Sequence, residues 1–260
     1  MNTEGKMGKR YRAPAVSKAF AILQAVSEVK EGMTISELAL RLGFSKSTVH
    51  GLVGTLVDIG ALHEQRESRK FSLGTTIVEI AFRNWNYIRL REEAQPYLET
   101  LRDAIGQTVF LGLLSRTTAF IIAQAEARDP LKISSPPGSS LPLLAGAVGK
   151  VFLAELPEDE ALKIIKTQGL PLFTPKSIVD ERIYLTQLAE VRKKGYAFDD
   201  EEYLPGVRAV AVALKNHRGM PLALWVVGFA ASMVEEKLPL IVGETLKTAG
   251  ELKNLFDRNL

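Results

Sequence analysis

Two short helical patterns separated by only three residues constrain this chain more than any other feature. Thr34 and Glu37 have the spacing of a capping box, in which each side chain bonds to the backbone N–H of the other residue. The helix that they open is expected to stop at Gly43, and Ser45 is expected to cap a second helix that runs to about Ile59. Helices this short and this closely joined have the dimensions of a helix-turn-helix.

The second helix has one apolar face and one face of small or hydrogen-bonding side chains. A face of this kind can lie in the major groove, which shows a distinct donor and acceptor pattern for each base pair. An ordinary three-helix bundle with a polar outer surface would give the same pattern. On the DNA interpretation, the helix is expected to present Lys46, Ser47, Thr48, His50 and Gly51 to the groove.

Two short alternating segments, 61–64 and 70–73, follow around a charged turn. Alternation on both sides of a turn predicts a β-hairpin. Arg66, Arg69 and Lys70 fall near its tip, where their charges would contact phosphates and fix the register without reading sequence. A basic hairpin placed directly after the second helix favours a winged helix-turn-helix over a plain bundle.

The distribution of charge agrees with this interpretation. The formal net charge of the 260 residues is only +3, but residues 1–75 hold eleven Lys and Arg against seven Asp and Glu. A basic first part suggests a polyanionic partner, although a charged tail is more often simply solvated. The chain lacks cysteine, an N-terminal apolar signal and any apolar run long enough to cross a bilayer. It is therefore expected to be cytoplasmic, without disulfides or a membrane segment.

The segment from Thr34 to Gly74 resembles the DNA-binding domain of the IclR family of bacterial transcriptional regulators. Segments 141–157 and 199–229 resemble two stretches of that family's effector-binding domain. The resemblance implies an α+β chain with a winged helix-turn-helix at 1–75, a linker helix at 76–89 and a GAF-like α/β domain for effector binding and oligomerisation at 90–260.

The same resemblance implies three partners. These are double-stranded DNA with a pseudo-palindromic operator, a small-molecule effector, and further copies of the chain in a homodimer or a dimer of dimers. Family members usually carry an arginine where this chain has Gly51, so a cation expected at the groove is missing and the operator sequence is affected.

An apolar stripe runs along the expected linker helix. Its members are Ile77, Ile80, Ala81, Trp85 and Ile88, broadened by Phe82. Such a stripe on a connector is buried either against its own domain or against a second subunit, and the resemblance favours the second subunit.

Strand-like and helical runs are interspersed in the rest of the chain, which predicts a sheet with helices packed on it. The strand-like runs are 108–114, 119–125, 207–214 and 222–229. Side chains alternate along the last run, so Trp225 is expected to share a face with Val227. Ser232 and Glu235 repeat the capping-box spacing and are expected to open a C-terminal helical segment.

Catalysis is not expected. Residues 146–150 only superficially suggest a phosphate loop, because Leu144 and Val151 stand where such a loop needs glycine and a hydroxyl residue. The three histidines, His50, His63 and His217, have no metal-ligand spacing and supply no plausible base for a nucleophile. Four consecutive acids at 199–202 are more typical of a solvated loop than of a catalytic pair. We therefore expect no enzyme activity, no metal and no cofactor.

By resemblance, the effector contacts are expected at Leu144, Ala147, Val148, Gly149, Asp199, Ala209, Trp225 and Val227, with an apolar wall near Leu131 and 141–144. The N–H groups of a helix opened by Gly149 and Lys150 would receive a carboxylate.

Several of these positions carry apolar side chains where relatives commonly carry polar or thiol groups. A small hydroxy or keto acid would therefore find few hydrogen-bond partners. Two interpretations follow. Either the chain is a repressor or activator that responds to an aromatic or otherwise apolar carboxylate, or Trp225 fills the cavity and the protein binds DNA constitutively, its C-terminal domain serving only for assembly.

Overall fold

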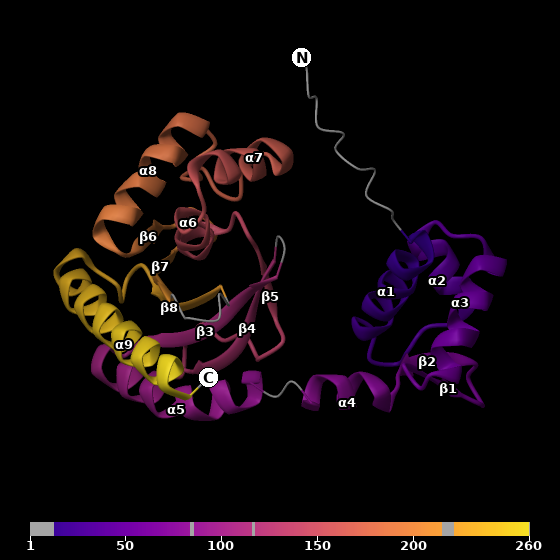
Figure 1. Ribbon diagram of the computed structural model, residues 1–260. Coiled ribbons are helices and arrows are strands. Elements are labelled where there is room, and N and C mark those ends of the chain that lie inside the picture. Colours follow the sequence, from indigo (N-terminus) through magenta and orange to yellow (C-terminus); the bar gives the residue numbers. More distant parts are fainter. Residues whose placement is uncertain (1–12, 84–85, 116–117, 215–220, 260) are drawn as a thin grey trace, which may run out of the picture. The chain divides into compact units, whose positions relative to one another are not determined.

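The computed structural model describes residues 13–83, 86–115, 118–214 and 221–259 (Figure 1). The chain divides into two compact units, residues 1–85 and residues 86–260, and each is described by itself. None of the described helices combines the length and the apolar character that a bilayer span requires.

Unit 1 contains a helix-turn-helix. Its elements are α1 (Pro14–Ser27), α2 (Ile35–Leu42), α3 (Lys46–Asp58), β1 (Leu62–Gln65), β2 (Lys70–Leu73) and α4 (Thr75–Arg83). The predicted capping box is formed, because Glu37 N–H donates to Thr34 Oγ1 at 3.3 Å and Thr34 N–H donates to Glu37 Oε2 at 2.7 Å. Gly43 ends α2 with a φ of 66°, and Ser45 caps α3 by accepting the N–H of Thr48 at 3.2 Å.

The three helices enclose a small core. Ile22, Leu38 and Val49, one from each helix, are fully buried in it. Phe71 of β2 joins this core and exchanges two backbone hydrogen bonds with Met33, at 2.8 and 3.0 Å. These hydrogen bonds hold the β1–β2 hairpin against the segment that leads into α2. The predicted wing therefore packs as part of unit 1.

The predicted linker helix corresponds to α4 as far as Arg83. Unit 2 then opens with α5, which begins at Asn86, before the position where we expected the second domain to start. Of the apolar stripe, Ile77 is half-buried and Ile80 is 63% exposed. Trp85 lies outside the described residues, and so do the side chains of Ala81, Phe82 and Ile88.

The described part of unit 2 forms an antiparallel sheet of six strands. They are β3 (Thr108–Ser115), β4 (Thr118–Ala125), β5 (Ser140–Pro142), β6 (Ala197–Asp200), β7 (Val207–Leu214) and β8 (Leu222–Phe229). Their order across the sheet is β5-β4-β3-β8-β7-β6, and every neighbouring pair is antiparallel. The predicted runs 207–214 and 222–229 coincide with β7 and β8.

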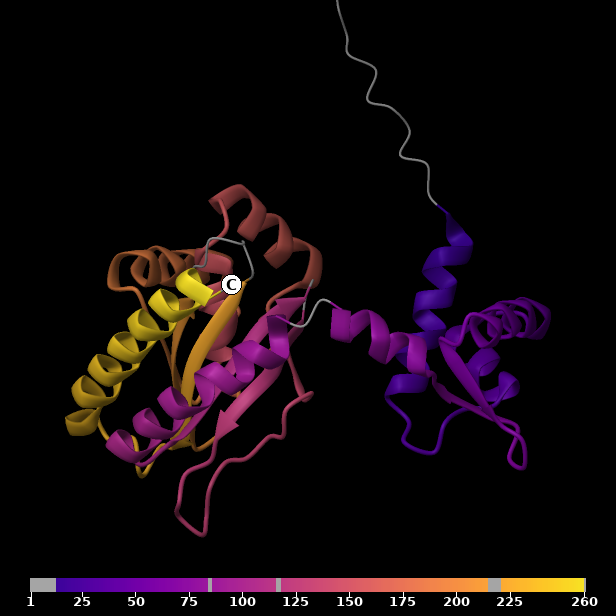
Figure 2. The same cartoon turned by 60° about the horizontal axis from the view of Figure 1, so that its bottom comes forward.

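Helices cover both faces of this sheet (Figures 1 and 2). One face carries α5 (Asn86–Ile105) and α9 (Leu238–Asn259), which lie side by side in Figure 2. The other carries α6 (Gly146–Ala154), α7 (Glu158–Gln168) and α8 (Glu181–Lys194). Because side chains alternate along β8, Leu224 packs toward α5 and α9 whereas Trp225 packs toward α6. The architecture confirms the α+β fold class.

The capping box predicted at Ser232 is not formed. Ser232 Oγ donates instead to Gln107 Oε1 and to the carbonyl of Phe229, so it holds the end of β8. A short 3-10 turn, Glu235–Lys237, leads into α9 without a side-chain cap.

Candidate DNA interface and effector site

The N-terminal end of α3 presents the predicted base-contacting residues on one surface. Lys46, Ser47, His50 and Gly51 are exposed, whereas Thr48 is half-buried and its hydroxyl lies 2.8 Å from the Ser45 hydroxyl. Nothing lies within 4 Å of the position that a side chain at Gly51 or Gly54 would occupy. This surface of α3 is therefore open to a close approach by another molecule.

A hollow of about 440 Å³ separates α3 from the wing. His50, Gly54 and Asp58 line it on the α3 side, and Glu64 and Arg69 line it on the hairpin side. The structure thus brings the polar face of α3 and the cationic hairpin to the same side of unit 1.

The three cations of the hairpin are not equivalent. Arg69 Nη1 lies 3.1 Å from Glu64 Oε1, so part of its charge is already neutralised. Arg66 forms no ion pair with any described residue, and Lys70 is half-buried near Glu37. Arg66 is consequently the cation best placed to take a phosphate without losing a partner.

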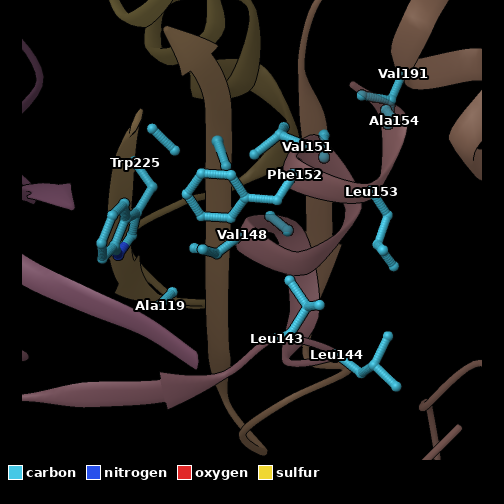
Figure 3. Close-up of a cluster of buried hydrophobic side chains, with 14 of the residues drawn as sticks. Ala119, Leu143, Leu144, Val148, Val151, Phe152, Leu153, Ala154, Val191 and Trp225 are labelled. Carbon is cyan, nitrogen blue, oxygen red and sulfur yellow. The ribbon is translucent and has the colours of Figure 1, made fainter. Parts of the chain in front are cut away.

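In unit 2, Trp225 fills the interior between the sheet and α6. Its side chain is 2% exposed and stacks on Phe110 with ring centroids 5.7 Å apart. Figure 3 shows Phe152 and Val148 of α6 extending toward the indole. A Cβ atom on Gly112 would lie 2.5 Å from Trp225 Cη2, so the ring occupies space that only a glycine leaves open.

The other predicted effector residues line the same interior. Leu144, Ala147, Val148 and Ala209 are buried, and Val227 pairs with Ala209 across β7 and β8. Gly149 packs against the carbonyl of Leu143, where a Cβ atom would lie 1.8 Å from the oxygen. Leu131 was wrongly expected in the apolar wall, since its side chain is 77% exposed.

The helix that was expected to open at Gly149 and Lys150 opens earlier, at Gly146. The space beside its first turn is taken by Asp199, because a Cβ atom on Gly146 would lie 1.9 Å from Asp199 Oδ2. An incoming carboxylate would therefore meet a carboxylate of the protein at this helix end, which could not be predicted from the residue pattern.

The four consecutive acids do not form the solvated loop that we considered typical. Asp199 is 5% exposed and accepts the N–H of Glu202 at 2.6 Å. Lys150, 1% exposed, donates from Nζ to Glu202 Oε1 at 2.5 Å and to the carbonyl of Phe198 at 3.2 Å. Asp200 is paired with Arg208, with 2.6 Å between the carboxylate and the guanidinium.

The pKa of Asp199 is raised to about 6, mainly by burial and in smaller part by the charge of Glu202, while the Glu202 N–H and the Lys150 ammonium oppose the shift. Burial likewise raises the pKa of Tyr184 well above its ordinary range. Sequence reasoning missed both Lys150 and Tyr184. A lysine within the otherwise apolar run Gly146–Ala154 was the available signal for a buried ion pair.

The described part of the chain contains no cluster of three or more His, Cys, Asp or Glu side chains that could hold a metal ion.

Asp199→Asn should stabilise the protein at neutral pH. A folded-state pKa of about 6, above the unfolded 3.8, means that protonation of Asp199 favours the folded state, and this contribution is lost as pH rises from about 4 to about 6. The neutral amide avoids the cost of burying a charge, so we expect a gain of roughly 1–3 kcal/mol at pH 7. Chemical unfolding between pH 4 and 7 measures it.

The matched control is Glu190→Gln, because the Glu190 carboxylate is exposed and pairs with Lys194 on the surface. Above pH 5 that variant should follow the wild-type profile. An Asp199→Asn protein that keeps the wild-type slope between pH 4 and 6 would show that another group titrates there.

Comparison with known proteins places both units in one family. The model of the IclR helix-turn-helix domain matches residues 15–66, and the model of the bacterial transcriptional regulator IclR C-terminal domain matches residues 84–254. The chain is similar to the HTH-type transcriptional regulator XynR of Escherichia coli K12, at 32% identity over 236 residues that cover 91% of this chain and 94% of XynR.

Solved structures give the same result. An IclR transcriptional regulator from Alicyclobacillus acidocaldarius matches with a TM-score of 0.77 and 28% identity, over 94% of this chain and 99% of that one. The inducer-binding domain of the PobR transcription factor from Acinetobacter, a double mutant in complex with 3-hydroxybenzoic acid, matches at TM-score 0.58 and 29% identity, over 64% of this chain and 98% of that one. The two family models together span most of the chain, and the relatives are transcriptional regulators. This chain belongs to the IclR family of bacterial transcriptional regulators, with a DNA-binding helix-turn-helix and an effector-binding domain.

Proposed function

We propose that the protein regulates transcription by binding a specific duplex operator through the surface that α3 and the hairpin share. The observation that carries this proposal is the shared hollow, with His50 on the α3 wall and Arg69 on the hairpin wall. In this arrangement Lys46, Ser47 and His50 read base edges, while the hairpin cations hold phosphates.

The two glycines of α3 shape how it can lie in a groove. Gly51 and Gly54 carry no side chain and have open space before them, so the helix backbone can come close to the bases. Because Gly51 brings no cation, the positive charge of the interface is left to Lys46 and the hairpin.

We propose that the protein acts as a homodimer or a dimer of dimers. Apolar side chains exposed on unit 1 support this proposal: Val78 and Ile80 of α4 are 51% and 63% exposed, and Val16 and Phe20 of α1 are 56% and 62% exposed. A two-fold assembly would present two α3 helices to two half-sites and so favours a pseudo-palindromic operator.

We propose further that unit 2 couples operator binding to a small aromatic or apolar effector, a carboxylate in the form predicted from the sequence. The 3-hydroxybenzoic acid bound by the similar PobR domain supports an aromatic ligand. The aromatic surfaces of Phe110, Phe152 and Trp225 offer a matching wall. The position of Asp199 beside Gly146 weighs against a carboxylate at that end of α6.

A second candidate is a constitutive DNA-binding protein whose unit 2 serves only for assembly. The packing of Trp225 favours it, because the indole stacks on Phe110 and lies against Gly112 in the space where an effector would enter.

The first prediction concerns the hairpin. The slope of log K against log salt is negative, and replacing Arg66 by Ala should reduce its magnitude by about 0.9, the value for one phosphate contact. The same change should weaken binding to all duplexes alike. Arg69→Ala should have a smaller effect, because Arg69 must break its ion pair with Glu64 before it can bind a phosphate. Fluorescence anisotropy on one labelled operator at several salt concentrations measures both slopes, and an unchanged slope for Arg66→Ala would show that the hairpin does not contact phosphate.

Ser47→Ala should instead change the order in which the protein prefers different operator sequences, because Ser47 lies on the base-contacting face of α3.

The second prediction concerns assembly. Ile80→Asp places a charge on the exposed apolar side of α4 and should lower the mass measured by light scattering, together with operator affinity. Leu40→Asp is the control, because Leu40 of α2 is 87% exposed and lies outside this surface. If both variants keep the assembled mass of the wild type, the subunit contact lies on a surface other than the exposed side of α4.

The third prediction separates the two candidates for unit 2. In a Trp85→Phe background, 3-hydroxybenzoate should quench Trp225 emission saturably and shift operator affinity over the same concentrations. The opposite result is that 3-hydroxybenzoate changes neither the emission nor the operator affinity, while the Trp225→Ala variant binds the acid in the cavity that the substitution creates. Trp225 would then fill the effector space, and the second candidate, in which unit 2 serves only for assembly, would be supported. Benzoate and 4-hydroxybenzoate serve as further probes of the same response.

A further inference from the structure

A segment of the chain is tied down over the start of α6. We call residues 170–178, which join α7 to α8, the strap. Thr174 Oγ1 donates to the carbonyl of Glu201 at 2.7 Å, and Ser177 Oγ donates to the carbonyl of Glu202 at 2.7 Å. Lys176 Nζ adds ion pairs to Glu201 at 2.7 Å and to Asp200 at 3.3 Å. The strap is therefore held by the acidic turn that follows β6.

A small space lies beneath the strap. Its volume is about 10 Å³, and it is lined by Leu144, Gly146, Leu170, Pro171, Phe173, Ser177, Ile178, Tyr184 and Glu202. This volume suits one oxygen or nitrogen group, close to the space of a single water molecule. Leu144 also belongs to the interior that Trp225 fills, but neither Trp225 nor Val227 lines this space.

One polar atom in this space has no partner. Tyr184, on α8, is 3% exposed, and its hydroxyl is buried without a hydrogen bond to any described residue. Buried hydroxyls are nearly always paired, because an unpaired one loses its bonds to water without replacement. The hydroxyl of Tyr184 is therefore able to bond to a group that enters from outside the chain, either a water molecule or a polar group of a ligand.

The charges around the space decide what that partner can be. Glu202 also lines the space, and one oxygen of its carboxylate accepts a hydrogen bond from Lys150. Asp199 Oδ2 lies against Gly146 at the edge of the same space. Acceptors and negative charge dominate, so a group that donates hydrogen bonds fits, and a second carboxylate does not.

We propose that Tyr184 and Glu202 form the polar end of a ligand site beneath the strap, which takes a small molecule with a hydroxyl or protonated amine on a compact apolar body. A ligand hydroxyl would accept from Tyr184 Oη–H and donate to the Glu202 carboxylate. A ligand ammonium would donate to both.

The apolar body of the ligand has a defined place. Leu170, Pro171 and Phe173 of the strap line the space. The hydroxyl or ammonium group of the ligand is enough to fill this space, so the apolar body of the ligand would take the place where these three side chains now pack. The strap already exposes apolar surface, with Leu172 71% and Phe173 37% exposed. Binding would therefore shift the strap and, through Thr174 and Ser177, the turn that carries Glu201 and Glu202.

This site rests on the proposed effector-responsive function and gives it a place and a ligand chemistry. Trp225 is not among the residues that line this space. A filled interior around Trp225 therefore does not exclude an effector-responsive protein.

The test uses three probes with the same ring and different head groups: benzyl alcohol, benzylamine and benzoate. Ligand-observed NMR titration of the full-length protein at pH 7 gives the three dissociation constants. We expect benzyl alcohol and benzylamine to bind more tightly than benzoate. Tyr184→Phe removes only the hydroxyl, and should weaken the two donor probes by about 2- to 10-fold, the value of one hydrogen bond.

One control variant locates the effect. Tyr97→Phe alters a tyrosine of α5, which packs on the opposite face of the sheet. It should not change the affinity for the donor probes. Thermal unfolding checks the fold of Tyr184→Phe, whose melting temperature should equal or exceed that of wild type because the variant loses an unpaired buried hydroxyl.

Three results would overturn the proposal: no binding of the donor probes, tighter binding of benzoate, or donor affinities that Tyr184→Phe leaves unchanged. Operator affinity is measured with and without benzyl alcohol, so that a failure of this ligand site can be told apart from a failure of the proposed effector-responsive function. Binding that leaves operator affinity unchanged supports the site and contradicts an effector role for it. An operator response to aromatic acids that survives Tyr184→Phe supports the function and overturns the site.

Discussion

The buried ion pair between Lys150 and Glu202 connects the parts of unit 2 that carry its candidate sites. Lys150 lies in the middle of α6, and its ammonium holds Glu202 and the carbonyl of Phe198, so it fixes α6 to the edge strand β6 and the turn after it. Removing either partner of a buried pair leaves an uncompensated charge, which costs about 3–5 kcal/mol. The strap, the carboxylate of Asp199 and the hydroxyl of Tyr184 are all arranged around this pair. The same contact adds to the apolar packing that holds α6 on the sheet beside Trp225.

Unit 1 depends on local constraints instead. A capping box at Thr34, a left-handed glycine at position 43 and a second cap at Ser45 set the ends of α2 and α3 within a few residues. Such signals are written in adjacent residues, and this explains why the helix-turn-helix and its hairpin could be predicted from the sequence. The capping-box spacing alone is not sufficient, however. Ser232 has the same spacing but bonds to Gln107, which is distant in sequence and adjacent only in the folded sheet.

The sites of unit 2 were harder to predict for the same reason. Alternation along β8 correctly placed Trp225 on the same face as Val227, because strand periodicity is local. The start of α6 at Gly146, the carboxylate of Asp199 beside it and the pairing of the four acids result from contacts between distant segments. Leu131 was misplaced because its position in the family's pocket was carried over from resemblance, whereas its loop leaves the side chain exposed in this chain. Tyr184 gave no sequence signal, since a tyrosine on an amphipathic helix is an ordinary core residue.

Gly112 and Trp225 occupy one shared volume, and this has a consequence for how the two positions can change over time. A Cβ atom at 112 would meet both the indole and the carbonyl of Phe120, at 2.5 and 2.4 Å. A tryptophan could enter position 225 of an ancestral chain only after position 112 had become glycine, or together with it. A smaller residue at 225 would remove only the contact with the indole, and the carbonyl of Phe120 would still exclude a side chain at 112. Position 112 is therefore under two independent constraints, one from a side chain and one from the backbone, and substitution at 225 can relax only the first.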